Sequence, residues 1–359
     1  MMRVRVERIE EEEVKEESEE MDFSEYLKAR ERVKQFIKEV SWNTIAKEVS
    51  GVGRVTCEKL SKVAKHPLVL LFHSIPTLAD SCGVSDLQVY NIVRWVCERL
   101  GISGLVSSKE FYERVKKYPT LKTGVKEVDE VLEIKPRSVY VFWGGYGSGK
   151  TQFCIFLSVK SMAKFRDGGL EGITIYIDTE GGFKPERFFE IYNEMKKRGV
   201  EFITNKPQVL LVQPTNSYEL RNFIANELPL LISKENVALV VVDSIIALPR
   251  VEYTGRNQLP SRQRAIMNIM QNLRKIAEVF KIPVVATSHA VASPSSFGTP
   301  IKMAGGYTLG HSTNVIVKFE NRGGVFKLTV EKGDKPQSAE FTISESGIEP
   351  VKRKVRVKK

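Results

Sequence analysis

The sequence predicts an α/β protein in two parts, a small all-helical domain followed by a larger domain with a mostly parallel sheet. Two observations predict this fold class. After Pro119, short apolar runs rich in β-branched residues alternate with helical segments, which is typical of a parallel sheet with helices on both faces. Before Pro119, apolar residues recur at helical spacing from Phe23 onward. A length of 359 residues also favours two domains.

Composition indicates a globular protein of a reducing compartment. Its 42% apolar residues can build a sizeable core, no apolar run is long enough to cross a bilayer, and the N-terminus lacks the apolar centre of a signal peptide. The four cysteines show no C-x-x-C pairing, so we expect reduced thiols. A zinc site using His66 or His73 is conceivable, but the spacing fits no zinc signature. We therefore expect a cytoplasmic protein with no membrane partner.

The charge of the chain is positive and unevenly placed. A net charge of +11 and an isoelectric point near 9.3 favour a polyanionic partner, nucleic acid first. Residues 1–22 form an acidic tail, with glutamates between Glu10 and Glu20, and residues 351–359 form a basic tail. We expect the acidic tail to be solvated and disordered. The basic tail could add non-specific affinity for phosphates, or only solubility.

Residues 23–102 are predicted to form the helical domain. A helix, the tight turn Gly51-Val52-Gly53 and a second helix make a helix-hairpin-helix unit within residues 45–60. Its glycines allow a sharp turn and leave backbone N–H groups at a helix start, where a DNA phosphate can bind. A weaker second copy runs from Leu78 to Val96. The alternative is a small helical bundle whose glycines only turn corners, since such hairpins often serve as spacers or partner sites.

Residues 103–118 are predicted to be a linker that enters a short helix, and residues 119–350 to form the core. Two late strands, 315–319 and 326–330, are joined by Asn321-Arg322-Gly323-Gly324, which predicts an antiparallel hairpin added at the sheet edge. The predicted strands of the parallel sheet are 139–143, 173–177, 209–212, 238–242 and 283–287. The predicted helices between them include 187–197, 218–231 and 261–280.

The most specific motif is the glycine loop that follows the first strand and opens a helix at Gln152. The pattern G-x-x-x-x-G-K-T in that context predicts backbone N–H groups that cradle phosphates, assisted by the positive end of the helix. Lys150 would reach the β- and γ-phosphates of ATP, and Thr151 would hold Mg²⁺. The alternative is a glycine-rich turn that happens to contain Lys-Thr. The residues predicted to contact the nucleotide are Gly144, Gly145, Tyr146, Gly147, Ser148, Gly149, Lys150, Thr151 and Gln152.

Polar residues at the carboxyl ends of three further strands complete the predicted site, because ligands of open parallel sheets bind there. Asp243 ends an apolar strand in the Walker B manner and would hold Mg²⁺, or could instead cap the next helix. Glu180 follows another strand and could orient the attacking water, or only stabilise a turn. His289 follows a third strand, where a residue can respond to the γ-phosphate. It could also be a surface histidine.

Two segments of the core are predicted to be loops. The first spans residues 249–260 and carries Arg250, Tyr253 and Arg256, with Arg262 just after it. Cations beside an aromatic ring suit the backbone of a single DNA strand, although an ordinary solvated loop could have the same composition. The second spans residues 297–306, is rich in glycine and proline, and is predicted to be mobile.

Together these motifs resemble those of the archaeal RadA recombinases, relatives of the bacterial RecA proteins, and the chain could be a diverged paralogue of them. The resemblance covers roughly residues 45–348 and includes the glycine hairpin and the phosphate loop. The further shared pieces, in order, are YIDTEG at 176–181, PER at 185–187, VVDS at 241–244, RVEYTGR at 250–256 with Arg262-Gln263, and Gly305-Gly306 followed by Thr308-Leu309.

The resemblance implies a RecA-like ATPase core and a DNA-binding recombinase of the cytoplasm and nucleoid. Such proteins form helical filaments on single-stranded DNA, with ATP and Mg²⁺ between subunits, and pair that strand with a homologous duplex in DNA repair. The resemblance also implies that Arg187 stacks on adenine and that Glu180 is the catalytic carboxylate. From their places in the phosphate loop and after the fifth strand, we also expect Lys150 and His289 to be catalytic. The first DNA loop would include Arg250, Tyr253, Arg256 and Arg262, and the second would span residues 290–304.

Three departures from the family pattern bear on assembly and coupling. The family's linker carries an F-x-x-A motif whose Phe docks into the next subunit, and here the docking places are held by Leu105 and Ser108. The family's Thr-Asn-Gln after the fifth strand is Thr287-Ser288-His289, and Tyr307 replaces a His after the paired glycines. Around residues 331–337 the match to the family's ATP-capping segment is loose, with Asp334 as a candidate.

These departures keep two further functions open. One is a paralogue that binds ATP and DNA and assists or remodels the filament of a true recombinase, without exchanging strands itself. The other is a RecA-fold signalling ATPase that forms closed rings. The first DNA loop and the hairpin domain weigh against the ring.

Overall fold

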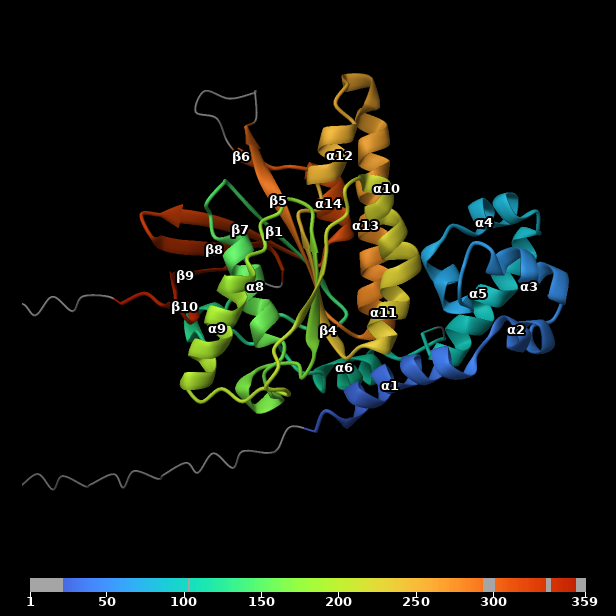
Figure 1. Ribbon diagram of the computed structural model, residues 1–359, viewed down its shortest axis with the longest axis horizontal. Coiled ribbons are helices and arrows are strands. Elements are labelled where there is room, and N and C mark those ends of the chain that lie inside the picture. The colour runs from blue at the N-terminus through green and yellow to red at the C-terminus, as the bar shows by residue number, and fades with distance from the viewer. Residues whose placement is uncertain (1–21, 103, 293–300, 334–336, 353–359) are drawn as a thin grey trace, which may run out of the picture.

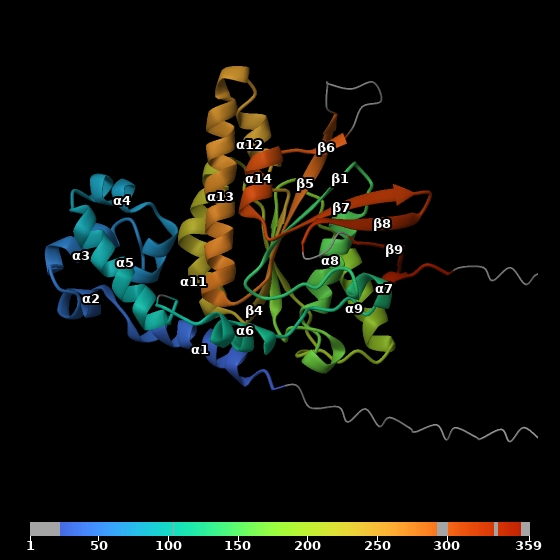
Figure 2. The same ribbon diagram turned by 180° about the vertical axis from the view of Figure 1, so that it is seen from behind.

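The computed structural model describes residues 22–102, 104–292, 301–333 and 337–352, and it shows a helical domain beside an α/β core (Figures 1 and 2). The expected acidic tail up to residue 21 and the basic tail from residue 353 lie outside the described residues. Within the described ranges, no helix is both long enough and apolar enough to cross a membrane.

The helical domain consists of two long helices, α1 and α5, and shorter ones between them. Ser41 and Ser85 each accept a hydrogen bond from the backbone three residues on and donate their own N–H to the side chain there, which caps a helix. Gly83 ends a helix in the left-handed region, at φ +57°. The elements of the domain are α1 (Ser24–Glu39), α2 (Trp42–Glu48), α3 (Arg54–Ser61), the 3-10 helix η1 (Pro67–Phe72), α4 (Ile75–Cys82) and α5 (Asp86–Leu100).

Both predicted helix pairs are present. Gly51 turns the chain between α2 and α3 at φ +77°, and the extended Gly53 stands directly before α3. The helices α4 and α5 make a second pair around Gly83. The contact of these pairs with DNA remains a prediction.

The buried side of α1 does not follow its apolar residues alone. Leu27 is one of the apolar residues that recur at helical spacing, yet its side chain is 46% exposed. The first half of α1 instead packs on the core, where Tyr26 contacts the rings of Tyr118 and Phe165. The helical spacing predicted the helix, but it does not identify the buried side of α1, because the two halves of this helix pack against different domains. The buried residues of α1 are Tyr26, Arg30, Val33 and Phe36.

Arg30 attaches α1 to the core. Its guanidinium is 8% exposed and donates to the carbonyl of Val237 at 2.5 Å and to Asn236 Oδ1 at 3.3 Å, at the start of β4. It also donates to Tyr26 OH at 3.2 Å, so all three acceptors are neutral. Further along α1, the ring of Phe36 packs inside the helical domain. The helix therefore joins the two domains.

The core is built on one sheet with the strand order β10-β9-β8-β7-β1-β5-β4-β2-β3, and β6 pairs with β5. Neighbouring strands from β7 to β3 are parallel, so the five predicted parallel strands are confirmed. β5 runs beyond its predicted end because its last residues pair with β6. The strands are β1 (Val139–Gly144), β2 (Ile173–Asp178), β3 (Val209–Val212), β4 (Val237–Asp243), β5 (Val284–Ala292), β6 (Ile301–Met303), β7 (Val315–Arg322), β8 (Val325–Lys332), β9 (Gln337–Ser344) and β10 (Gly347–Pro350).

The C-terminal part of the sheet confirms the predicted hairpin and extends it. Gly323 and Gly324 turn β7 into β8 with φ +63° and +92°, the two left-handed residues of a type I′ turn. However, β7 pairs in parallel with β1, so the antiparallel addition begins only at β8. The sequence analysis missed β9 and β10. These strands bury few residues, and their apolar pattern is correspondingly weak.

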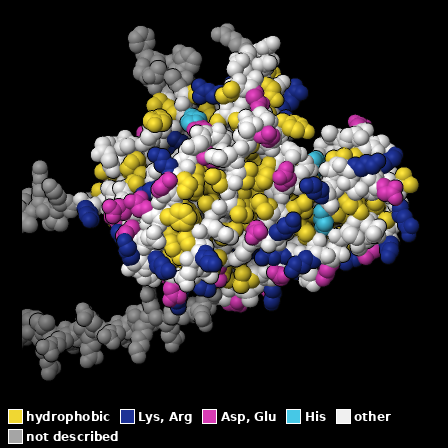
Figure 3. Space-filling view, in the orientation of Figure 1, with side chains coloured by type: hydrophobic (Ala, Val, Ile, Leu, Met, Phe, Trp, Pro, Cys, Tyr) yellow, Lys and Arg dark blue, Asp and Glu magenta, His cyan; other side chains and the backbone are white. Residues whose placement is uncertain are grey.

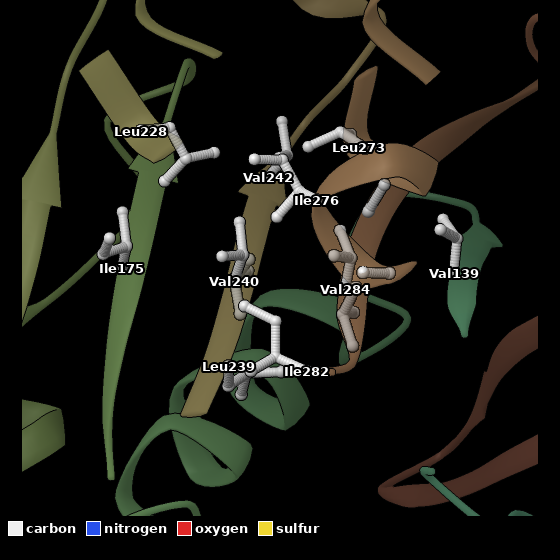
Figure 4. Close-up of a cluster of buried hydrophobic side chains, with 14 of the residues drawn as sticks. Val139, Ile175, Leu228, Leu239, Val240, Val242, Leu273, Ile276, Ile282 and Val284 are labelled. Atoms are coloured by element: carbon white, nitrogen blue, oxygen red, sulfur yellow. The ribbon is translucent and has the colours of Figure 1, made fainter. Parts of the chain in front are cut away.

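Helices cover both faces of the sheet, with α8 and α9 on one side and α10, α11 and α13 on the other (Figure 1). Between them, apolar side chains of β1, β2, β4 and β5 meet Leu273 and Ile276 of α13 and Leu228 of α11 (Figure 4). The predicted helix 218–231 is interrupted by a π-helical turn, η3 (Phe223–Glu227). The helices of the core are α6 (Ser108–Lys116), α7 (Lys126–Asp129), α8 (Lys150–Lys160), η2 (Phe165–Asp167), α9 (Pro185–Lys197), α10 (Ser217–Asn222), α11 (Leu228–Lys234), α12 (Ala247–Glu252), η4 (Arg256–Gln258), α13 (Leu259–Phe280) and α14 (Gly306–Ser312).

Candidate active site and DNA interface

The predicted phosphate loop joins β1 to α8. Gly147 and Gly149 adopt left-handed backbone, at φ +69° and +93°, which favours glycine. Packing selects glycine as well, because a Cβ on Gly144 would lie 2.2 Å from Phe319 O and one on Gly149 would lie 2.8 Å from Phe326 Cδ1. Strands β7 and β8 therefore support the loop from the side.

Lys150 lies folded against the loop. Its ammonium donates to Gly144 O at 3.1 Å, Gly145 O at 2.9 Å and Ser148 Oγ at 3.2 Å. Burial lowers the pKa of Lys150. Three neutral oxygens thus hold the cation at a place where phosphate oxygens could replace them. Tyr146, by contrast, projects fully into solvent.

Asp243 ends β4 and gathers three hydroxyl groups. Thr151 Oγ1 and Tyr176 OH each donate to Asp243 Oδ2 at 2.8 Å, and Thr287 Oγ1 donates to Oδ1. The structure therefore brings together Thr151 and Asp243, as the sequence predicts. The alternative role of Asp243 as a helix cap is wrong, because α12 follows Ile246 and has no side-chain cap.

Sequence reasoning missed two members of this cluster, Tyr176 and Thr287. They come from β2 and β5, the strands on either side of β4. Burial raises the pKa of Tyr176 well above its ordinary value, so its hydroxyl remains a donor. These two neighbours of Asp243 follow from the order of the strands in the sheet, and no pattern within a single strand predicts that order.

Asp178 and Glu180 have different roles at the end of β2. Asp178 is 2% exposed and accepts the backbone N–H groups of Gly182 and Phe183 at 3.1 Å, so it organises the turn. Glu180 projects from that turn and accepts hydrogen bonds from other side chains. The turn-stabilising role that the sequence allowed for Glu180 belongs to Asp178.

Glu180 and His289 form a close pair. Glu180 Oε1 lies 2.5 Å from His289 Nε2 and also accepts a hydrogen bond from Ser244 Oγ. The hydrogen bond from His289 is the largest cause that lowers the pKa of Glu180, against the raising effect of burial. Glu180 is therefore held as a carboxylate.

His289 also lies beside the second predicted DNA loop. Its carbonyl accepts the N–H of Ala304 at 2.8 Å, and Ser288 Oγ donates to Ala304 O at 2.8 Å. The described residues on both sides of this loop form the β5–β6 hairpin rather than irregular chain. Residues 293–300 of the predicted second DNA loop, which include the first part of the predicted mobile loop 297–306, lie outside the described ranges, as do Asp334 and the side chain of Tyr307.

Arg187, at the start of α9, lies beside the phosphate-loop helix. Its Nε donates to Gln152 Oε1 at 2.9 Å, and its terminal nitrogens donate to the carbonyls of Ser344 and Glu345. The structure thus brings together the two predicted nucleotide residues outside the glycine loop. Stacking of Arg187 on adenine remains a prediction.

The predicted first DNA loop is largely helical. α12, η4 and α13 occupy most of residues 249–260, so the expectation of a continuous loop is wrong. Pro249 and Pro260 fall in the first turns of helices, where the missing N–H has no intrahelical partner to lose. The start of α13 lies at the same end of the molecule as β6 (Figures 1 and 2). Among the predicted DNA-binding side chains, Arg250 is exposed, Tyr253 and Arg262 are half-buried, and that of Arg256 lies outside the described part.

The predicted docking residues Leu105 and Ser108 lie between α5 and the body of α6. The side chain of Leu105 is fully exposed. Ser107 rather than Ser108 caps α6, by accepting the N–H of Glu110 at 3.1 Å. Docking of this segment to another subunit remains a prediction.

The oxygen donors of the site fit Mg²⁺. Thr151 Oγ1 and Asp243 Oδ2 lie 2.8 Å apart, and Mg²⁺ typically takes one or two protein oxygens together with phosphates and water. No group of three or more His, Cys, Asp or Glu side chains able to hold a metal occurs among the described residues. His66 and His73 each bond to an oxygen within the protein, which leaves the zinc alternative without support.

The parallel sheet, the glycine loop with its folded lysine and the strand-ending aspartate bonded to the loop threonine together define a P-loop ATPase of the α/β class. The Rad51 family model matches residues 114–351. The DNA repair and recombination protein RadA of Cenarchaeum symbiosum (strain A) is 31% identical over 315 residues, which are 84% of this chain and 78% of that protein. The protein of the same name from Aeropyrum pernix is 31% identical over 313 residues, 84% of this chain and 95% of that protein. The chain belongs to the Rad51 family, and its core is a RecA-like ATPase domain.

Proposed function

We propose that the protein is a Mg²⁺-dependent, DNA-stimulated ATPase that assembles on single-stranded DNA and promotes homologous pairing and strand exchange in DNA repair. The observation that carries the proposal is the short connection from Glu180 to His289 and from His289 to Ala304. It links the candidate catalytic carboxylate to the hairpin predicted to bind DNA. The names of the two RadA relatives support the same function. A cytoplasmic, nucleoid-associated location would follow from it.

The site residues would act as follows. ATP supplies a γ-phosphate that is open to in-line attack by water. Lys150 would exchange its bonds to Gly144 O and Gly145 O for phosphate oxygens. Thr151 and Asp243 would hold Mg²⁺. Both side-chain bonds of Glu180 reach Oε1, which leaves Oε2 to accept a hydrogen bond from the attacking water.

Assembly would use the linker and a sheet edge. β3 is the last strand in the sheet order, and Leu211 within it is 39% exposed. Unpaired edges of this kind accept an added strand from another chain. The exposed Leu105 of one copy is therefore the candidate anchor against a neighbouring copy.

A second candidate is the paralogue that assists another recombinase. The favouring observation is the docking segment itself, where Leu105 offers a smaller apolar surface than an aromatic ring and Ser108 adds a hydroxyl. Such a protein would keep ATP binding and depend on a partner for filaments.

The deciding experiment combines an ATPase assay, with and without single-stranded DNA, and negative-stain microscopy with ATP, Mg²⁺ and that DNA. Filaments of this protein alone with DNA-stimulated turnover are expected. Monomers with unstimulated turnover would favour the paralogue, and closed rings the signalling ATPase. Lys150→Ala, which should abolish hydrolysis while the fold persists, is the control for a contaminating ATPase.

A further inference from the structure

A basic groove lies between α1, the linker and α6. It has a volume of about 640 Å³, and Leu105 and Val106 form part of its wall. Figure 3 shows Lys and Arg side chains, with Asp and Glu among them, along the lower edge of the molecule, where α1 and α6 lie. Five cationic and two acidic residues line the groove, an excess of three positive charges. The cationic residues are Lys28, Arg32, Arg114, Arg137 and Lys281, and the acidic ones are Glu25 and Glu278.

The two carboxylates do not neutralise this charge. Glu278 is shared by Arg137 at 2.7 Å and Lys281 at 3.1 Å, and Glu25 is 3.5 Å from Lys28. Arg32 is exposed and has no ion-pair partner among the described residues. Arg114 pairs with Glu110 of its own helix at 3.0 Å. The uncompensated positive charge of the described groove therefore lies on Arg32 and on Arg137 and Lys281, which share one carboxylate.

We propose that the acidic segment Glu10–Glu20 of the same chain binds in this groove. The segment carries eight glutamates and one lysine, a charge opposite to that of the groove. Its attachment point is close, because the chain enters the described structure at Asp22, directly before α1. Only a few residues of the same chain therefore separate the negative segment from the helix that lines the positive groove.

The segment can reach the whole groove. Lys28 and Arg32 are four residues apart and share one face of α1. Arg32 lies about 15 Å along the helix from Asp22, whereas eleven extended residues span about 36 Å. A short tether of this kind gives the acidic segment a high effective concentration at the groove, so weak ion pairs are enough to keep the segment bound.

Occupancy of the groove would cover Leu105 and Val106. Because Leu105 is the candidate anchor for subunit assembly, the acidic segment would act as an internal competitor of assembly. This consequence rests on the proposed function, whereas binding of the segment to the groove does not.

Zero-length cross-linking of the full-length protein tests the binding. A carbodiimide joins carboxylates to amines in contact, and mass spectrometry identifies the linked peptides. Intramolecular links from Glu10–Glu20 to Lys28 are expected, and they should fall about tenfold in R32E/R114E, where like charges face the segment. The matched control Lys38→Glu, on the exposed last turn of α1 outside the groove, should leave the links unchanged. Raising the salt from roughly 0.05 to 0.5 M should also remove them.

Other outcomes would overturn the proposal. Equal linking to Lys28 and Lys38, or no effect of R32E/R114E, would mean that the segment does not select the groove. Links found only in covalent dimers would assign the segment to a second copy. Loss of DNA affinity in R32E/R114E, with unchanged links, would make the groove a nucleic-acid surface instead.

Assembly provides a separate measurement. Full-length protein with the eight glutamates changed to glutamine should assemble severalfold more readily with ATP and DNA than the native chain, measured by light scattering. If the native chain shows the expected cross-links but the glutamine variant assembles no more readily than the native chain, the competitor role is refuted. Cross-linking requires neither ATP nor DNA, so failure of the proposed function and failure of this inference are distinguishable.

Discussion

At the residue scale, the two glycines that open the phosphate loop differ in what surrounds them. A Cβ on Gly144 would meet Phe319 O at 2.2 Å and Ser148 Oγ at 2.8 Å, whereas a Cβ on Gly145 would have nothing within 4 Å. The same motif therefore contains one glycine that packing requires and one with open space around it.

Gly144→Ala should consequently destabilise the protein, and Gly145→Ala should not. The expected loss for Gly144→Ala is about 1–3 kcal/mol of unfolding free energy or more, because the clash is with backbone that cannot turn away. Urea unfolding of both variants measures the difference. Equal stability of the two variants would contradict the close approach of β1 to β7.

His289 should set the acid limit of ATP hydrolysis. The hydrogen bond from His289 lowers the pKa of Glu180 from the ordinary 4.5, so Glu180 stays a carboxylate to lower pH. Any stability that this hydrogen bond adds to the fold is lost only as the pH falls through the lowered pKa. His289→Ala should raise the pKa of Glu180, and the acid limb of the pH–rate profile should move to higher pH. Turnover measured at intervals across roughly pH 4 to 8 tests this. An unshifted limb, or the same shift in the exposed His311→Ala, would refute the role of the pair.

At the element scale, α13 connects two surfaces. Its first turn carries Arg262, and α13 packs against α12, which carries Arg250. Its last turn carries Glu278, which pairs with Arg137, and the Arg137 guanidinium lies 4.7 Å from the ring centre of Phe111 in α6. One 22-residue helix thus reaches from the candidate DNA end to the linker.

Arg262→Ala should weaken single-strand binding and lower its salt dependence. Removing one phosphate contact reduces the slope of log affinity against log salt by about one. Arg274→Ala, an exposed cation further along the same helix, should leave the slope unchanged. Fluorescence anisotropy at several salt concentrations gives both slopes, and equal slopes in the two variants would count against a DNA contact at the start of α13.

At the scale of the whole molecule, α1 fixes the helical domain to the core through the buried Arg30. Arg30→Met keeps the length of the side chain but leaves Val237 O and Asn236 Oδ1 without their donor. The expected loss is about 1–3 kcal/mol in docking of the two domains, with a more extended solution shape. Urea unfolding and small-angle scattering measure the two effects. The exposed Lys38→Met should change neither, and a compact, fully stable Arg30→Met would show that the domains do not depend on this contact.

The sequence by itself determined the local features of this protein. Periodicity, β-branched runs and turn residues predicted the parallel strands, the β7–β8 hairpin and the helix pairs of the N-terminal domain, because these features depend on neighbours in the chain. The G-x-x-x-x-G-K-T loop after β1 and the strand ending at Asp243 were predicted for the same reason, whereas binding of phosphate and Mg²⁺ there stays a prediction.

Only the tertiary structure decided which distant residues meet. Strand order placed Tyr176 and Thr287 on Asp243 and brought His289 to Glu180. Docking between domains buried Arg30 and left Leu27 exposed, although Leu27 is one of the apolar residues at helical spacing. β9 and β10 were not predicted, because they bury few residues and their apolar pattern is weak. Each is defined by its pairing with a neighbouring strand of the sheet. Burial and pairing across the fold depend on packing between segments far apart in sequence, which no local pattern contains.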